Sequence, residues 1–156
     1  MTAATRLIVL GDLVHARRSH QAQLGEALLK WRGSHTQITM ILVRGNHDRH
    51  AGRLVADLQI EEVEQPTMID GMWMRHDPVA ESSAMPTLAG HVHPVVTVQD
   101  FDRSAVRLPC FVFGPDGVGV LPSFGTFTGG ANVRHLDGQR CYACAGSRVV
   151  PIAATT

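Results

Sequence analysis

Residues 38–48 read ITMILVRGNHD, and this stretch decides the fold. Its apolar run predicts a buried strand that ends where the polar residues begin. The same layout occurs upstream at residues 7–12, which read LIVLGD, and the apolar spacing between the two runs predicts a helix from Ser19 or His20 to Gly33. Strand, helix and strand form the unit of a parallel sheet, whose ligand sites lie at the carboxyl ends of the strands. We therefore expect an α/β fold with a site on these loops.

From residue 67 onward, the sequence favours short strands separated by Gly and Pro. A helix-bearing first part followed by hairpin-like units predicts two packed sheets within one α/β domain, spanning residues 1–156. The strands expected in this part are residues 72–75, 87–90, 95–98, 106–113, 118–121 and 141–145.

The composition limits the classes of protein to which this chain can belong. Hydrophobic residues make up 44% of the 156 positions and charged residues 18%, which favours a folded protein over a disordered one. The 14 basic and 14 acidic residues cancel, so no global field attracts nucleic acid or an anionic membrane, and any attraction to phosphate must be local. Three cysteines, with no signal-peptide pattern and no apolar run of membrane length, predict a cytoplasmic protein with reduced thiols and no membrane partner.

Three other segments share the polar character of residues 45–48. They are residues 11–12 (GD), 75–77 (RHD) and 90–93 (GHVH), and each follows a short apolar run. Carboxylate, amide and imidazole ligands suit Mn, Fe or Zn ions rather than a thiolate site. Arginines flank these segments, and their planar guanidinium groups match the geometry of phosphate oxygens. Each arginine taken singly could equally be a solvated surface residue. These arginines are Arg17, Arg18, Arg44, Arg49 and Arg53.

The amino-acid sequences of five segments resemble motifs of a known family. They are residues 10–17 (LGDLVHAR), 43–49 (VRGNHDR), 90–94 (GHVHP), 108–111 (LPCF) and 121–130 (LPSFGTFTGG). Their order resembles the calcineurin-like metallophosphoesterase family and, within it, the bacterial ligase-associated DNA damage response endonucleases. The resemblance implies a metallophosphoesterase-like two-sheet sandwich flanked by helices.

A two-metal centre follows from this resemblance. Asp12 would bridge both ions, and Asn46, His76 and His91 would complete one site. His93 would belong to the other site. The ions would be divalent, with Mn expected and Fe or Zn as alternatives.

The resemblance also implies a catalytic pair. His47 would face the scissile phosphate, and Asp48 would orient its ring. The role of His15 is undecided: the resemblance places it near the site, but it could equally support the metal ligands from outside. Substrate contacts are expected from Arg44, Arg49, His15 and Arg17.

The implied activity is hydrolysis of a phosphoester by an enzyme that uses two ions for an in-line displacement. We expect a DNA endonuclease or phosphodiesterase linked to DNA repair. Its partners would be a phosphoester substrate such as DNA, and other DNA-repair proteins.

One departure from the family pattern affects the second metal site. Family members begin with a strand ending in Asp-x-His, and the ten residues before Gly11 contain neither Asp nor His. Either the recorded start lies downstream of the true one, which we favour, or the chain is a real short form. The alternatives to an active enzyme are therefore a catalytically impaired module that binds a single metal ion and an inactive fragment.

Overall fold

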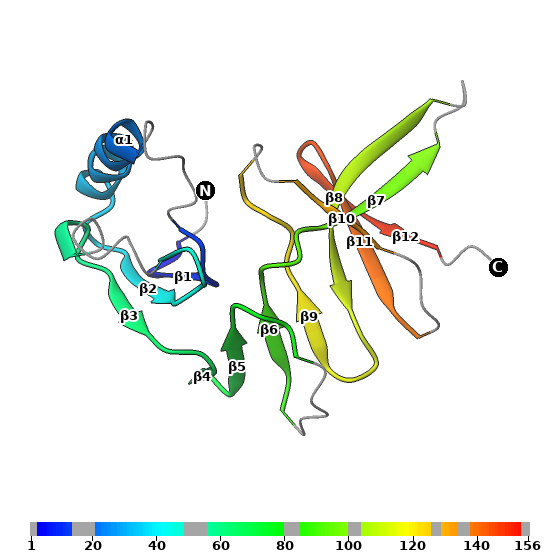
Figure 1. Ribbon diagram of the computed structural model, residues 1–156, viewed down its shortest axis with the longest axis horizontal. Coiled ribbons are helices and arrows are strands. Elements are labelled where there is room, and N and C mark those ends of the chain that lie inside the picture. The colour runs from blue at the N-terminus through cyan, green and yellow to red at the C-terminus, as the bar shows by residue number, and fades with distance from the viewer. Residues whose placement is uncertain are drawn as a thin grey trace. The chain divides into compact units, whose positions relative to one another are not determined.

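The computed structural model describes residues 3–13, 21–48, 56–79, 85–99, 104–125, 129–133 and 138–153 (Figure 1). The chain divides into two compact units. The first comprises Met1–Thr67 and Met74–His76, and the second comprises Met68–Trp73 and Asp77–Thr156.

The first unit is built on a parallel sheet of three strands in the order β1-β2-β3. Strand β1 is Arg6–Val9, β2 is Thr39–Val43 and β3 is Glu61–Val63, and helix α1, Gln21–Gly33, connects β1 to β2. Because β1 and β2 are parallel neighbours, the strand, helix and strand expected from the sequence are confirmed. The expected helix start at Ser19 or His20 lies outside the described residues.

The core of this unit explains why β2 is almost wholly apolar. Met40 and Leu42 are buried together with Leu58 and Ile60, as expected for the central strand of a parallel sheet. Helix α1 packs its apolar positions against this cluster through Leu24 and Leu28. The helix therefore covers apolar surface of the sheet.

The second unit holds most of a nine-stranded sheet with the order β10-β7-β8-β9-β6-β5-β4, to which β11 and β12 are added beside β8. Six of these strands match the expected short runs, and β4, β10 and β12 were not expected. The bounds are β4 Thr67–Ile69, β5 Met72–Arg75, β6 Thr87–Ala89, β7 Pro94–Gln99, β8 Ala105–Phe113, β9 Val118–Val120, β10 Ala131–Asn132, β11 Arg140–Ala145 and β12 Arg148–Ile152.

Two of the three thiols lie in the core of the second unit. Cys110 and Cys141 are buried on one face of β8 and β11, where Cys141 is opposite Val112 and Ala143 is opposite Cys110. Burial and a hydrogen bond with Cys141 raise the pKa of the Cys110 thiol to about 12. These two cysteines act as small apolar side chains in this core.

The fold is thus a mixed α/β fold, as the sequence predicted. No helix among the described residues is long and apolar enough to cross a membrane.

Candidate metal centre

Two tight loops follow the parallel strands β1 and β2. Because Val9 is the register partner of Leu42, both loops leave the same edge of the sheet. Gly11 has a φ of 82°, and a Cβ on it would overlap the His76 ring and lie 2.9 Å from the Cα of Gly45. The absence of a side chain at Gly11 therefore lets the two loops and the His76 ring come into contact.

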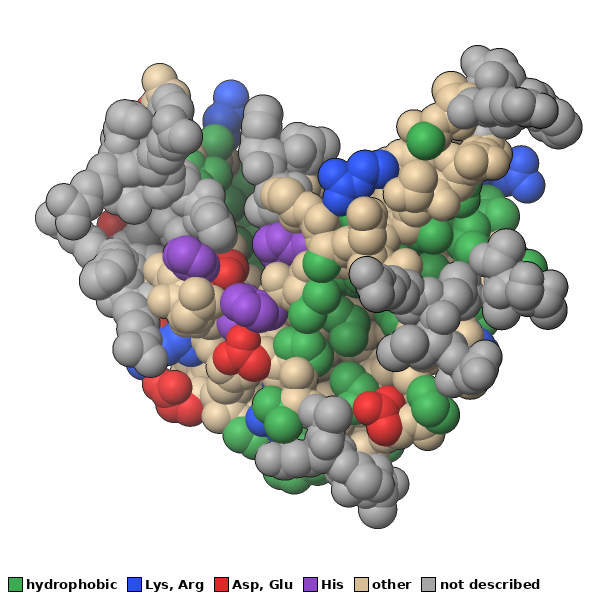
Figure 2. All heavy atoms as spheres, turned by 45° about the vertical axis from the view of Figure 1, so that its right-hand side comes forward, with side chains coloured by type: hydrophobic (Ala, Val, Ile, Leu, Met, Phe, Trp, Pro, Cys, Tyr) green, Lys and Arg blue, Asp and Glu red, His purple; other side chains and the backbone are tan. Residues whose placement is uncertain are grey.

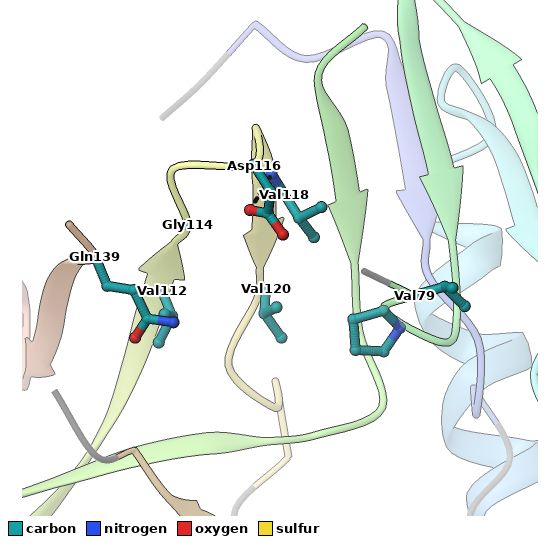
Figure 3. Close-up of a pocket in the computed structure, with 8 residues that line it drawn as sticks. Val79, Val112, Gly114, Asp116, Val118, Val120 and Gln139 are labelled. Carbon is teal, nitrogen blue, oxygen red and sulfur yellow. Dashed lines mark hydrogen bonds between the residues drawn. The ribbon is translucent and has the colours of Figure 1, made fainter. Parts of the chain in front are cut away.

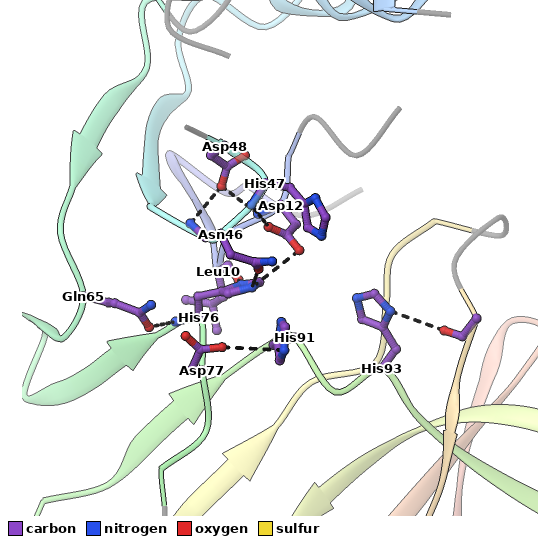
Figure 4. A network of polar contacts seen from close by, with 12 residues as sticks. Leu10, Asp12, Asn46, His47, Asp48, Gln65, His76, Asp77, His91 and His93 are labelled. Carbon is purple, nitrogen blue, oxygen red and sulfur yellow. Dashed lines mark hydrogen bonds and ion pairs between the residues drawn. The ribbon is translucent and has the colours of Figure 1, made fainter. Parts of the chain in front are cut away.

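Asp48 joins these two loops (Figure 4). Its Oδ2 accepts hydrogen bonds from the backbone nitrogens of Asp12, at 2.7 Å, and Gly45, at 2.9 Å. In the opposite direction, the backbone nitrogen of His47 donates to Oδ1 of Asp12 at 3.0 Å. Asp48 is only 2% exposed, and within the described part of the chain its Oδ1 has no hydrogen-bond partner.

This role of Asp48 was not expected from the sequence. We expected its carboxylate to orient the ring of His47, whereas the bonds described here run to the backbone of both loops. The orientation of the His47 ring stays a prediction. The backbone contacts show that Asp48 also holds the main chain around Asp12.

His76 follows β5 and is the most deeply buried of the candidate ligands, with 1% exposure. Its backbone nitrogen donates to Oε1 of Gln65 at 2.7 Å, and its Nδ1 lies 2.9 Å from the carbonyl oxygen of Leu10. A carbonyl oxygen can only accept, so Nδ1 carries the proton in this contact. The other ring nitrogen, Nε2, is thereby directed at Asn46 and Asp12.

The arrangement around Nε2 fits a cation. This nitrogen lies 2.9 Å from Oδ1 of Asn46 and 3.4 Å from Oδ2 of Asp12. In a neutral ring, Nε2 presents a lone pair, so three electron-pair donors face one another. Such a cluster is favourable only with a proton or a metal ion among its members. One carboxylate, one amide and one imidazole form a donor set suited to Mn, Fe or Zn.

In the second unit, the loop after β6 carries His91 and His93. Nε2 of His91 lies 3.7 Å from Oδ1 of Asp77, and Nδ1 of His93 lies 3.3 Å from the carbonyl oxygen of Gly129. Histidine side chains reach the surface in Figure 2, and the side chain of His91 is 44% exposed. The ring of His91 is thus accessible to a ligand.

Three of the candidate ligands share an uncommon backbone conformation. The φ angles are 55° at Asp12, 65° at His91 and 50° at His93. Residues other than Gly rarely adopt this left-handed backbone conformation, and such conformations concentrate at functional sites. This conformation therefore supports a functional role for both loops, independently of the residue types.

Arg44, an expected substrate contact, has two acidic neighbours. Its Nε and Nη2 lie 3.1 Å and 2.7 Å from Oε2 of Glu62, and its Nη1 lies 2.6 Å from Oε1 of Glu64. The hydrogen bond that Arg44 donates to Glu62, and then the charges of Glu64 and Glu62, raise the pKa of Arg44. Both glutamates offset its charge, so its contact with substrate stays a prediction. The expected contacts His15, Arg17 and Arg49 lie outside the described residues.

Sequence reasoning missed the residues that support the ligands. Gln65 and the carbonyl of Leu10 hold His76, and Asp77 lies beside His91. The sequence offered a signal for the role of Asp77, because this residue directly follows a candidate ligand in the segment 75–77. Gln65 and Leu10 had none, because the contact between Leu10 and His76 spans 66 positions of the sequence.

A separate hollow of about 150 Å³ lies in the second unit (Figure 3). Valines form much of its wall, with Asp116 and Gln139 as the polar members. None of the predicted site residues is among the described residues that line it. Its chemistry therefore differs from that of the candidate metal centre.

Comparison with known proteins supports the interpretation of these motifs as those of a nuclease. No protein-family model matches the chain, and no curated protein matches it. Among solved structures, the chain is similar to the crystal structure of Pseudomonas putida nuclease MPE, with a TM-score of 0.81 and 38% sequence identity. The match covers 95% of this chain and 71% of that chain.

Proposed function

Because the chain belongs to the family of the Pseudomonas putida nuclease MPE, we propose that it is a metal-dependent hydrolase that cleaves phosphoester bonds in nucleic acid. The observation that carries this proposal is the arrangement at His76. Its ring is buried, its Nδ1 is held by Leu10, and its Nε2 faces Asn46 and Asp12. The resemblance of the motifs supports DNA as the nucleic acid and DNA repair as the setting.

In this proposal, residues 1–156 act as one catalytic domain of the metallophosphoesterase type. Asp12, Asn46 and His76 hold a divalent ion, with Mn expected. The order of the motifs in the sequence supports two further ligands: His91 would help to hold this ion, and His93 together with Asp12 would hold a second one. When bound, such ions supply Lewis acidity, which stabilises negative charge on phosphoryl oxygens and makes an attacking water more acidic.

The remaining side chains bind and position the phosphoester. His47 is exposed, so its ring can donate a hydrogen bond to a phosphoryl oxygen or a proton to the leaving oxygen. Asp48 holds the loop that carries His47 through Gly45, and it fixes the backbone of Asp12. A positioned donor of this kind matters most where negative charge grows in the transition state.

The test is hydrolysis of bis(p-nitrophenyl) phosphate and of a DNA oligonucleotide, with and without Mn²⁺. We expect turnover of both substrates that requires the metal and falls by about a hundredfold or more in His47→Ala. His35→Ala is the matched control, because His35 lies after α1 and bonds the carbonyl of Trp31. Metal-independent turnover, or equal turnover in His47→Ala, would contradict the proposal. One bound ion without turnover would favour the metal-binding module.

A further inference from the structure

Two stretches of the second unit are attached to the segment that carries His91 and His93. The backbone nitrogen of Leu121 donates to the carbonyl of Ala89 at 2.8 Å. The backbone nitrogen of Ala131 donates to the carbonyl of His93 at 3.1 Å. Since β6 and β9 are parallel, with Ala89 opposite Val120, the residues that follow both strands leave the same edge of the sheet. Leu121 and Ala131, where these two stretches meet the sheet, are therefore neighbours of the histidine segment.

Phe124 lies on the first of these stretches and is fully exposed, with a relative accessibility of 108%. An exposed phenylalanine forgoes the stabilisation that burial of its ring would give. An exposed aromatic ring offers a flat face to a nucleobase, and every base can stack on such a face.

Arg107 lies at the second stretch. Its Nη2 donates to the carbonyl of Gly130 at 2.8 Å, and the preceding carbonyl, that of Gly129, lies 3.3 Å from Nδ1 of His93. The cation of Arg107 and the candidate ligand His93 thus contact the carbonyls of two consecutive residues, Gly130 and Gly129, within the same unit. A guanidinium has five N–H donors in a planar fork, of which this bond uses one, and this geometry suits phosphate oxygens.

The geometry points to a nucleic-acid contact surface formed by Arg107, Phe124 and the segment with His91 and His93. Arg107 binds a backbone phosphate, and Phe124 stacks on an unpaired base. Such local contacts are consistent with a chain whose 14 basic and 14 acidic residues cancel. This inference rests on the proposed function and names the residues that select nucleic acid over a small phosphoester.

The experiment compares two substrates in the full chain with Mn²⁺ present. For a single-stranded DNA oligonucleotide, we expect Phe124→Ala and Arg107→Gln each to raise KM by about fivefold or more. For bis(p-nitrophenyl) phosphate, kcat/KM should stay within about twofold, because this ester has no base and no neighbouring phosphate. Matched controls are Val149→Ala and Arg148→Gln on β12, where both side chains are exposed and should affect neither substrate.

Several outcomes would overturn the surface. An unchanged oligonucleotide KM in both variants would do so, and so would equal losses on the two substrates, because these would reflect damage to the metal centre. If the wild type hydrolyses neither substrate, the proposed function fails, and the contact surface is then tested by oligonucleotide binding instead. Fluorescence polarisation with a labelled oligonucleotide would then support the surface if both variants bind about fivefold more weakly. Equal affinity in that measurement would reject it.

Discussion

The backbone nitrogen of Asp12 donates a hydrogen bond of 2.7 Å to Oδ2 of Asp48, across 36 positions of the sequence. Asp12 has a φ of 55°, a conformation that costs free energy in a residue other than Gly. The bond to Asp48 helps to offset that cost, because a charged acceptor makes a stronger hydrogen bond than a neutral one. The position of the candidate metal-binding carboxylate therefore depends on Asp48.

Two substitutions of Asp48 separate its hydrogen bonds from its charge. In Asp48→Ala, the part-buried backbone donor of Asp12 and the buried one of Gly45 lose their acceptor, so we expect the free energy of unfolding to fall by about 2–4 kcal/mol. In Asp48→Asn, a carbonyl oxygen can still accept both bonds, and the expected loss is about 1 kcal/mol. Urea denaturation without metal measures both values. Equal losses would show that the backbone contacts matter little.

The close approach at Gly11 gives a second prediction. Gly11→Ala should destabilise the chain and abolish Mn²⁺-dependent turnover, because the new methyl group overlaps the His76 ring. Gly71→Ala is the matched control: Gly71 has a similar φ of 76°, and nothing lies within 4 Å of the added Cβ. This control should cost about 1–2 kcal/mol through backbone strain alone and keep turnover. Similar behaviour of the two variants in denaturation and turnover assays would contradict the packing at Gly11.

The buried thiol of Cys110 predicts how stability depends on pH. Its pKa is raised from 9.0 to about 12 in the folded chain, so the unfolded chain releases this proton at lower pH. The stabilisation is fully present below pH 9.0 and is lost as pH rises toward about 12. Urea denaturation at several pH values should therefore show a fall above pH 9 that is less steep in Cys110→Ala. The same steepness in both proteins would argue against burial of this thiol.

The sequence predicted the elements whose own residues determine them. Strand β2 has an apolar run because both its faces are covered, and α1 has helical spacing because it covers the sheet. By contrast, β3 has the sequence EEV and no strand-like alternation. Its place beside β2 depends on backbone pairing of Leu42 with Glu62 and on the contact of Glu62 with Arg44. Such distant contacts leave no local pattern.

The candidate site divides in the same way. Motif spelling identified Asp12, Asn46 and His76, and the first unit brings these side chains together. The groups that hold them are a backbone carbonyl at Leu10 and a side chain at Gln65, which carry no sequence signal for this role. Ligands are specified by residue type, whereas their supports are specified by the fold.

The most direct test of the metal centre is calorimetric titration of the chain with Mn²⁺. Asn46→Ala is the informative variant, because Asn46 is exposed and its loss removes a ligand oxygen without opening the core. Asn132→Ala, at an exposed position of β10, is the matched control. The account predicts that the wild type and Asn132→Ala bind Mn²⁺ equally, and that Asn46→Ala binds it about tenfold or more weakly. Equal affinity in all three proteins, or no binding by the wild type, would contradict it.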